Sequence, residues 1–314
     1  MFQRLLFFCL FLLPTLCPVT AQTVIDLQQG GRVRAKTIDD YKAERRMAEI
    51  ELRDSADYVA LLHSGITAFA TDSLDAAERY FKKAMRLRPS NAGNRVVRYY
   101  LASIEAARGH LKQADQQLAD LLRDFPDYLD ARLLRAGVRL QLGRHAEALD
   151  DAKTVLAADD HISLPMRSQA LFVSSGACYS LRRYAECRDA VQQVLRLQPD
   201  HVGARILEAM TYYYMQQPAE AINRLNLLIS AHPADVDALQ ARAGLHHELQ
   251  HFSLARADYD SLISLQPADA SLYVERARVL LSLGEKTAAR RDLDKAVSLG
   301  MPTGMVQPLL MLTK

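Results

Sequence analysis

Tryptophan is absent from this 314-residue chain, and only four residues are cysteine, two of them near the amino terminus. So few cysteines, without a CxxC pair, exclude a small disulfide-built domain and a zinc ribbon. No long run of one charge sign occurs, and the net charge is only +2, which excludes a surface built to neutralise nucleic-acid phosphates. The hydrophobic share of 49% and the charged share of 24% exclude collagen, wholesale disorder and a polytopic membrane protein. We therefore expect a soluble fold held together by ordinary packing.

The first residues have the pattern of a secretory signal peptide. Arg4 supplies a positive charge, Leu5–Leu13 is an almost unbroken apolar run, and a small residue suited to cleavage stands at Ala21. The run is shorter than the roughly 20 apolar residues that a spanning helix needs. Two alternatives stay open: an uncleaved membrane anchor, and lipidation at Cys17, which the bulky Leu16 before it disfavours. We predict a signal peptide over residues 1–21 and a periplasmic or secreted mature chain without a spanning segment.

Most of the chain repeats with a period of 34 residues. Five prolines follow helical patterns, and they define units in which positions 8 and 20 are always small. Small residues are needed where two antiparallel helices approach closely. A turn is expected near position 15, where four units have Asp72, Gly109, Gly143 and Gly284. The seven predicted units cover residues 58–91, 95–128, 129–162, 168–201, 202–235, 236–269 and 270–303.

The first unit carries the fullest set of these residues, namely Gly65, Ala77, Phe81, Ala84 and Pro89. This pattern resembles the tetratricopeptide repeat (TPR) family, and the resemblance extends over residues 58–303. It implies an all-α, right-handed superhelical solenoid of about seven helix-turn-helix units that serves protein interaction rather than catalysis. The chain departs from the family pattern because it has no tryptophan for position 4 and lacks the proline in units three and seven.

The segments on either side of the repeats are expected to protect the ends of the stack. Residues 22–57 should form a flexible arm followed by an N-terminal capping helix over Ile38–Asp54, since Thr37 and the acidic residues after it favour a helix start. Residues 304–314 are predicted as a tail or short cap. Pro308 is expected to open a last helix that extends to Leu312 and docks on unit seven.

Position 7 of the first helix and position 23 of the second should lie nearly opposite each other in a hairpin. Where one is charged, the other carries the opposite charge, and in unit five the signs are reversed. Such pairing predicts ion pairs across the hairpin. The pairs are Arg135 with Asp151, Glu208 with Arg224, Arg242 with Asp258, and Arg276 with Asp292.

The strongest enzymatic pattern is an H-E-x-x-H sequence formed by His247, Glu248 and His251. In zinc peptidases this spacing places two histidines on one helical face with the glutamate as base. Here the expected turn falls between the two histidines, which argues against a shared face. Glu275 is offered as a third ligand only by its downstream position. We predict no catalytic residue, no metal and no cofactor, and keep a zinc peptidase as the enzymatic alternative.

Two cysteines remain in the repeat region, Cys178 and Cys187, one on each predicted helix of unit four. In an oxidising compartment they could form a disulfide. Alternatively, both are small buried hydrophobic residues, since free cysteine packs well and position 20 requires a small side chain. The sequence leaves both interpretations open.

The TPR resemblance implies that an inner groove is lined by positions 2, 5, 9 and 12 of each first helix. Exposed apolar and aromatic surface of this kind typically marks a partner site. We therefore predict a cell-envelope scaffold that binds a peptide, a helix or a partner subunit, and no nucleic acid; a subunit that uses its convex face is an architectural alternative. The groove residues are Leu62, Ile66, Phe69, Tyr99, Leu133, Leu140, Phe172, Tyr179, Ile206, Met210, Tyr213, His247 and Arg278.

Overall fold

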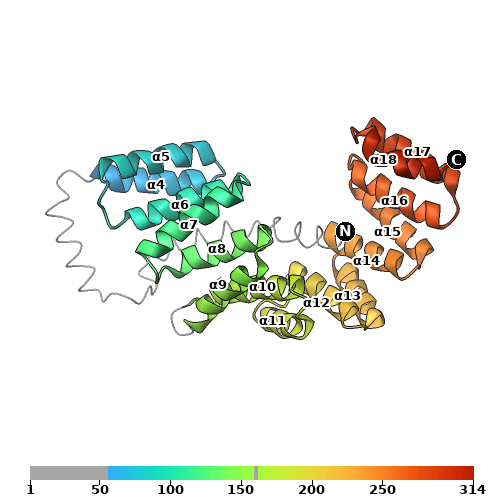
Figure 1. Cartoon of the computed structure of the whole chain (residues 1–314), viewed down its shortest axis with the longest axis horizontal. Helices are drawn as coiled ribbons and strands as arrows, with labels where there is room; N and C mark the ends of the chain where they lie inside the picture. Colours follow the sequence, from blue (N-terminus) through green and yellow to red (C-terminus); the bar gives the residue numbers. More distant parts are fainter. Residues whose placement is uncertain (1–55, 159–161) are drawn as a thin grey trace. The chain divides into compact units, whose positions relative to one another are not determined.

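The computed structural model describes residues 56–158 and 162–314, and within them the chain forms fifteen α-helices and no strand (Figure 1). The predicted all-α fold is confirmed. The predicted signal peptide, flexible arm and capping helix lie outside the described residues. The helices are α4 Ala56–Ala70, α5 Leu74–Leu87, α6 Asn94–Ala107, α7 Leu111–Asp124, α8 Leu129–Gln141, α9 His145–Ala157, α10 Leu164–Ser180, α11 Tyr184–Leu197, α12 Val202–Tyr214, α13 Pro218–Ala231, α14 Val236–Glu248, α15 Phe252–Leu265, α16 Ala270–Ser282, α17 Lys286–Ser298 and α18 Thr303–Leu312.

The described chain divides into two compact units, residues 56–186 and residues 187–314, which we call the N-terminal and C-terminal units. In each unit successive helices pack as pairs, such as α4 with α5 and α14 with α15. The first helices of neighbouring pairs also contact one another: α4 contacts α6, α6 contacts α8, and α12 contacts α14. Within each unit these first helices form a layer, and we call its surface on the side away from the second helices the first-helix face. No helix among these residues is both long and apolar enough to span a membrane.

The turn within each predicted repeat contains one residue in the left-handed backbone conformation. Glycine takes this role at Gly109, Gly143 and Gly284, as expected from the sequence, and Asp72 does so with φ +56°. The other three predicted units use non-glycine residues at the same position 15, with φ values of +60° to +63°. These are Arg182, Gln216 and Gln250. One helix therefore ends and the next begins around the same repeat position throughout.

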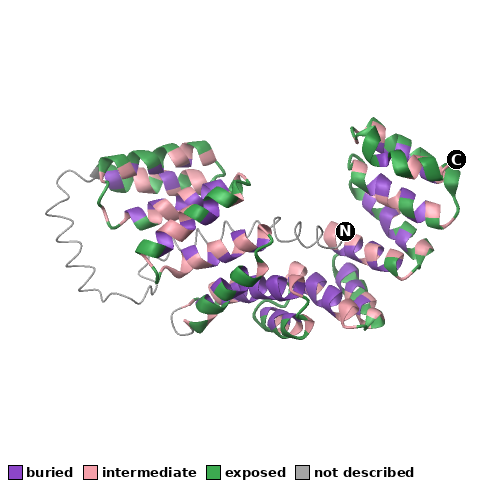
Figure 2. Ribbon diagram, in the orientation of Figure 1, coloured by how far each residue is buried: buried purple, intermediate pink, exposed green. Residues whose placement is uncertain are grey.

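Each helix has buried and exposed stretches (Figure 2), and the small residues at positions 8 and 20 are among the buried ones. Ala77, Ala102 and Ala136 are fully buried, as are Ala209 and Ala243. In the first pair, α4 and α5 approach so closely that a Cβ built on Gly65 would lie 2.6 Å from Cε1 of Phe81. The two helices of a pair can therefore pack this closely only if the residues at these positions are small.

All four predicted cross-helix ion pairs are present, including the reversed pair. In the C-terminal unit the arginines also reach back to the preceding helix pair. Arg242 donates to Asn226 Oδ1 at 2.7 Å, and Arg276 donates to Asp260 Oδ1 at 2.8 Å. The same guanidinium group thus closes its own hairpin and joins it to its neighbour, a link that the sequence analysis did not predict.

The last helix differs from its prediction. It begins at Thr303 rather than at Pro308, which lies inside it. Pro308 lies beyond the first four residues, whose N–H groups have no intrahelical acceptor, so it removes one backbone hydrogen bond of the helix. Val306 is fully buried in a cluster with Ala296 and Leu293, so the helix docks on α17 as expected.

Candidate functional site

The predicted groove residues of the N-terminal unit fall into two groups. Leu62, Ile66, Phe69 and Tyr99 are half-buried and pack against the core cluster that contains Phe81, Val97 and Tyr100. The second group is more than nine-tenths buried. It consists of Leu133, Leu140, Phe172 and Tyr179. Part of the predicted lining therefore supports the fold, and the half-buried group is the part with access to solvent.

A chain of aromatic rings connects α4, α5, α6 and the start of α8 in this unit. Phe69 of α4 lies edge-on to Tyr100 of α6, with ring centroids 5.3 Å apart, and Phe81 stacks on Tyr100 at 5.2 Å. Tyr99 contacts Tyr100 at 5.4 Å and Tyr128 at 5.7 Å. The aromatic chain thus extends from the first predicted unit to the start of α8. Phe81 and Tyr100 are buried, so Phe69, Tyr99 and Tyr128 are the rings of this chain that can present area to a partner. A rigid ring does so at little entropic cost.

The Tyr128 end of this aromatic chain also has a carboxylate, Asp130, and a guanidinium group, Arg95. Asp130 lies in the first turn of α8 and is half-buried, and burial raises the pKa of its carboxyl group. Burial and the nearby Asp130 charge raise the pKa values of Tyr99 and Tyr128. The Arg95 guanidinium carbon lies 5.9 Å from the centre of the Tyr128 ring. Tyr99, Tyr128 and Asp130, which we call the Asp130 site, therefore combine two rings with a negative charge.

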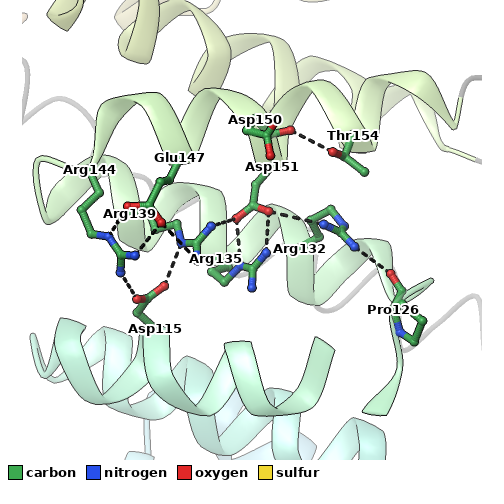
Figure 3. Close-up of polar contacts among 10 residues, drawn as sticks. All are labelled: Asp115, Pro126, Arg132, Arg135, Arg139, Arg144, Glu147, Asp150, Asp151 and Thr154. Carbon is green, nitrogen blue, oxygen red and sulfur yellow. Dashed lines mark hydrogen bonds and ion pairs between the residues drawn. The ribbon is translucent and has the colours of Figure 1, made fainter. Parts of the chain in front are cut away.

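The largest polar network of the same unit lies between α7, α8 and α9 (Figure 3). Arg135 binds both oxygens of Asp151, through Nε at 2.8 Å and Nη2 at 2.6 Å. Arg139 donates to Asp151 at 2.9 Å and to Asp115 at 3.0 Å, and Arg144 also pairs with Asp115. Because the carboxylates already hold arginine donors, this network stabilises the contact between neighbouring helix pairs rather than offering a vacant ligand site.

In the C-terminal unit, Ile206 and Met210 are buried, Tyr213 and His247 are half-buried, and Arg278 is exposed. Tyr213 lies edge-on to Tyr214 at 5.2 Å, and the His247 ring lies 5.7 Å from that of Phe252. Burial, with Glu248 contributing, raises the pKa of Tyr213. The accessible part of the predicted lining therefore consists of Arg278 and of two rings, Tyr213 and His247, at the carboxyl ends of α12 and α14.

The two histidines of the H-E-x-x-H sequence lie on different elements. His247 belongs to α14, which ends at Glu248, and His251 is the N-cap of α15. Gln250 between them has φ +60°, so the helix does not continue. The His251 ring instead lies 5.7 Å from that of His246. Across residues 56–158 and 162–314 no three His, Cys, Asp or Glu side chains are grouped as a metal site.

Cys178 and Cys187 are both buried. Cys187 Sγ lies 3.1 Å from the Thr211 hydroxyl oxygen. Burial raises the pKa of the Cys178 thiol, which disfavours a reactive thiolate. The packing role therefore describes both side chains here, and the disulfide stays a prediction.

The sequence analysis missed three residues of this region, Arg95, Tyr128 and Asp130. Asp130 holds position 2 of its predicted unit, a position that the family resemblance places on the inner wall, so its repeat position is a signal that identifies it. Tyr128 is the last residue of the preceding predicted unit, outside the expected lining positions. Only the packing of α8 beside α6 brings it to Tyr99.

Comparison with known proteins gives the same fold. A tetratricopeptide-repeat family model matches residues 99–161 and 248–302. The crystal structure of a tetratricopeptide repeat protein from Parabacteroides merdae is 26% identical with a TM-score of 0.67, covering 82% of this chain and 98% of that one. A TPR protein from Thermus thermophilus is 20% identical with a TM-score of 0.51, covering 60% of this chain and 99% of that one.

One curated protein, the Protein CTR9 homolog of Arabidopsis thaliana, is 30% identical over 184 residues, which are 57% of this chain. The matched region is only 16% of that protein's length. A tetratricopeptide-repeat model thus matches two stretches of this chain, and the helix pairs and the structural neighbours have the same fold over a larger part of it.

Proposed function

We propose that this protein is a non-enzymatic scaffold that binds a protein partner on its first-helix face. Tetratricopeptide-repeat proteins generally mediate protein–protein interactions, and the repeats present a preformed surface for them. The observation that carries the proposal is the aromatic chain from Phe69 to Tyr128, since aromatic anchors commonly dominate binding energy. The partner is an extended peptide, a helix or a folded subunit.

We further propose that the mature chain acts in the cell envelope of a bacterium. The support is the sequence of residues 1–21, in which a short apolar run follows Arg4 and precedes a small-residue cleavage site. Amino-terminal sequencing of the protein from fractionated cells tests this proposal. A mature chain that begins at Gln22 in the periplasmic or secreted fraction supports it, and a chain that retains residues 1–21 in the cytosol contradicts it.

Affinity capture tests the binding surface. Tagged protein is used to capture partners from native envelopes, and the captured proteins are compared with those held by a Tyr99→Ala variant and a Tyr80→Ala variant. Tyr99 belongs to the aromatic chain, whereas Tyr80 is exposed on α5 with 40% of its surface accessible. We expect specific partners to be lost with Tyr99→Ala and retained with Tyr80→Ala. If the partners were lost with Tyr80→Ala and retained with Tyr99→Ala, binding would be assigned to the surface of the second helices.

A further inference from the structure

The Asp130 site lies at the end of the aromatic chain, where α6 meets α8. The rings of Tyr99 and Tyr128 have centroids 5.7 Å apart and planes tilted by 46°, so they form an angled pair rather than a flat stack. Asp130 follows Tyr128 by two residues and begins the first turn of α8. Burial raises the pKa values of Tyr99, Tyr100 and Tyr128, and the charge of Asp130 adds to this.

The carboxylate of Asp130 is unusual among the acidic groups of this unit. Asp115 and Asp151 are also withdrawn from solvent, and each accepts hydrogen bonds from arginine side chains. Among the residues that the structure describes, no side chain donates a hydrogen bond to Asp130, and none forms an ion pair with it. Asp130 is therefore a half-buried carboxylate that contacts no positively charged or hydrogen-bonding side chain within the described residues.

A purely structural role does not account for this arrangement. An acidic residue in the first turn of a helix is normally stabilised by the amino-terminal end of the helix, which lowers its pKa. At Asp130 burial outweighs such effects, and the pKa is raised. Its ionised form is thus less stable in the folded protein than in water. Ionisable groups held at a cost to stability are typical of functional sites.

Arg95, beside the Asp130 site, indicates that the site suits a positively charged group. The guanidinium group of Arg95 lies over the Tyr128 ring, and its charge lowers the pKa of Asp130. Arg95 is exposed and has no ion pair within the described part of the chain. A cation therefore already lies over one ring of the pair, and the Asp130 carboxylate, which accepts a backbone hydrogen bond, has no side-chain donor among the described residues. An aromatic pair beside a carboxylate suits a cationic side chain, because the ring faces and the carboxylate both attract positive charge.

We propose that Tyr99, Tyr128 and Asp130 bind the ammonium or guanidinium group of a lysine or arginine side chain of the protein partner. This inference rests on the proposed function and specifies the chemistry of the partner. The cation would lie against the tyrosine rings and donate hydrogen bonds to the Asp130 carboxylate. Arg95 would be displaced from its position or would flank the bound residue.

The test uses the full mature chain and short peptides, so it does not require the natural partner. The probes are Ac-Ala-Lys-Ala-NH2, Ac-Ala-Arg-Ala-NH2 and the neutral Ac-Ala-Gln-Ala-NH2, titrated while the ring resonances of Tyr99 and Tyr128 are followed by NMR. We expect the two cationic peptides to shift these resonances saturably and the glutamine peptide to leave them unchanged. A larger shift from one cationic peptide would identify lysine or arginine as the preferred side chain.

Three variants make the outcome specific. Asp130→Asn keeps the shape and removes the charge, and it should weaken binding about tenfold or more, as expected for the loss of a charge-assisted hydrogen bond. Asp127→Asn, at an exposed position one residue before Tyr128, should bind as the unmodified protein does. Arg95→Gln should bind equally or more tightly, since it removes a competing cation. Thermal melting of Asp130→Asn should be unchanged or slightly raised.

Several results would overturn the proposal. These are no saturable shift with either cationic peptide, an equal shift with the glutamine peptide, or undiminished binding by Asp130→Asn. A loss of stability in Asp130→Asn together with loss of binding in Arg95→Gln would show that Arg95 and Asp130 form a structural pair. The affinity capture described above can succeed in each of these cases, so failure of the cation site and failure of the scaffold function are distinguishable.

Discussion

Arg276 and Asp292 form a two-pronged ion pair across the hairpin of α16 and α17. Nε lies 2.7 Å from one carboxylate oxygen and Nη2 lies 2.7 Å from the other, while Nη1 of the same group donates to Asp260 on α15. These contacts raise the pKa of Arg276, with the hydrogen bonds to Asp292 contributing most. One side chain therefore determines both the geometry within a helix pair and the contact between pairs.

The first prediction concerns this ion pair. Asp292→Asn should lower the free energy of unfolding by about 1–3 kcal/mol, because it weakens charge-assisted hydrogen bonds at a carboxylate that is only 7% exposed. Asp260→Asn is the matched control, and its more exposed carboxylate should contribute about 1 kcal/mol or less. Urea unfolding followed by circular dichroism measures both. Equal losses in the two variants would contradict the assignment of Asp292 as the main partner.

The second prediction concerns two glycines in first helices. Gly65→Ala should destabilise the protein by about 1–3 kcal/mol, since the new Cβ would lie 2.6 Å from the Phe81 ring. Gly137→Ala meets no atom within 4 Å and should stabilise the protein by up to about 1 kcal/mol through helix propensity. Thermal unfolding of both variants checks the pair. A stabilising Gly65→Ala would show that α4 and α5 can separate without cost.

The third prediction concerns the turn between α14 and α15. Gln250 has φ +60°, a backbone conformation that residues with a Cβ seldom adopt. Gln250→Gly should therefore raise the free energy of unfolding by about 0.5–1 kcal/mol. The converse change, Gly143→Gln at φ +76°, should lower it by about 1 kcal/mol. Melting temperatures should therefore move in opposite directions. Movement in the same direction would indicate that side-chain contacts, not backbone strain, determine stability at these turns.

The fourth prediction concerns pH. His246 is only 7% exposed, and its Nδ1 has no hydrogen-bond partner among the described residues. Burial lowers its pKa, opposed by Asp258 and reinforced by Arg242 and His251. The unfolded chain, with a histidine pKa of about 6.5, then binds a proton more readily than the folded chain does. Stability contributed by His246 is present above about pH 6.5 and is lost as the pH falls toward its lower folded-state pKa.

Unfolding of the His246→Gln variant should accordingly depend less steeply on pH between about 6.5 and 5 than unfolding of the unmodified protein. His63→Gln, at an exposed position on α4, is the control and should leave the slope unchanged. His145 and His201, whose pKa values burial also lowers, contribute to the dependence that remains. An identical slope in His246→Gln and the unmodified protein would contradict the prediction.

The accessible residues of the proposed binding face could be predicted from the sequence only in part. Of the predicted groove residues, Phe69, Tyr99, Tyr213 and His247 are half-buried, whereas others such as Leu133 and Ile206 are buried. Position within a repeat states which side of a helix a residue occupies. It does not state how closely the next helix approaches that side, and this distance decides between lining and core.

By itself, the sequence determined the helical repeat, the left-handed turn position and the four ion pairs across hairpins. Each of these depends on contacts within one 34-residue unit, where spacing along the chain fixes spacing in space. Tertiary structure alone decided the reach of Arg276 to Asp260 and the meeting of Tyr99 with Tyr128 beside Asp130. Those contacts join different units, so they depend on how one helix pair packs on the next, a geometry that repeat position does not encode.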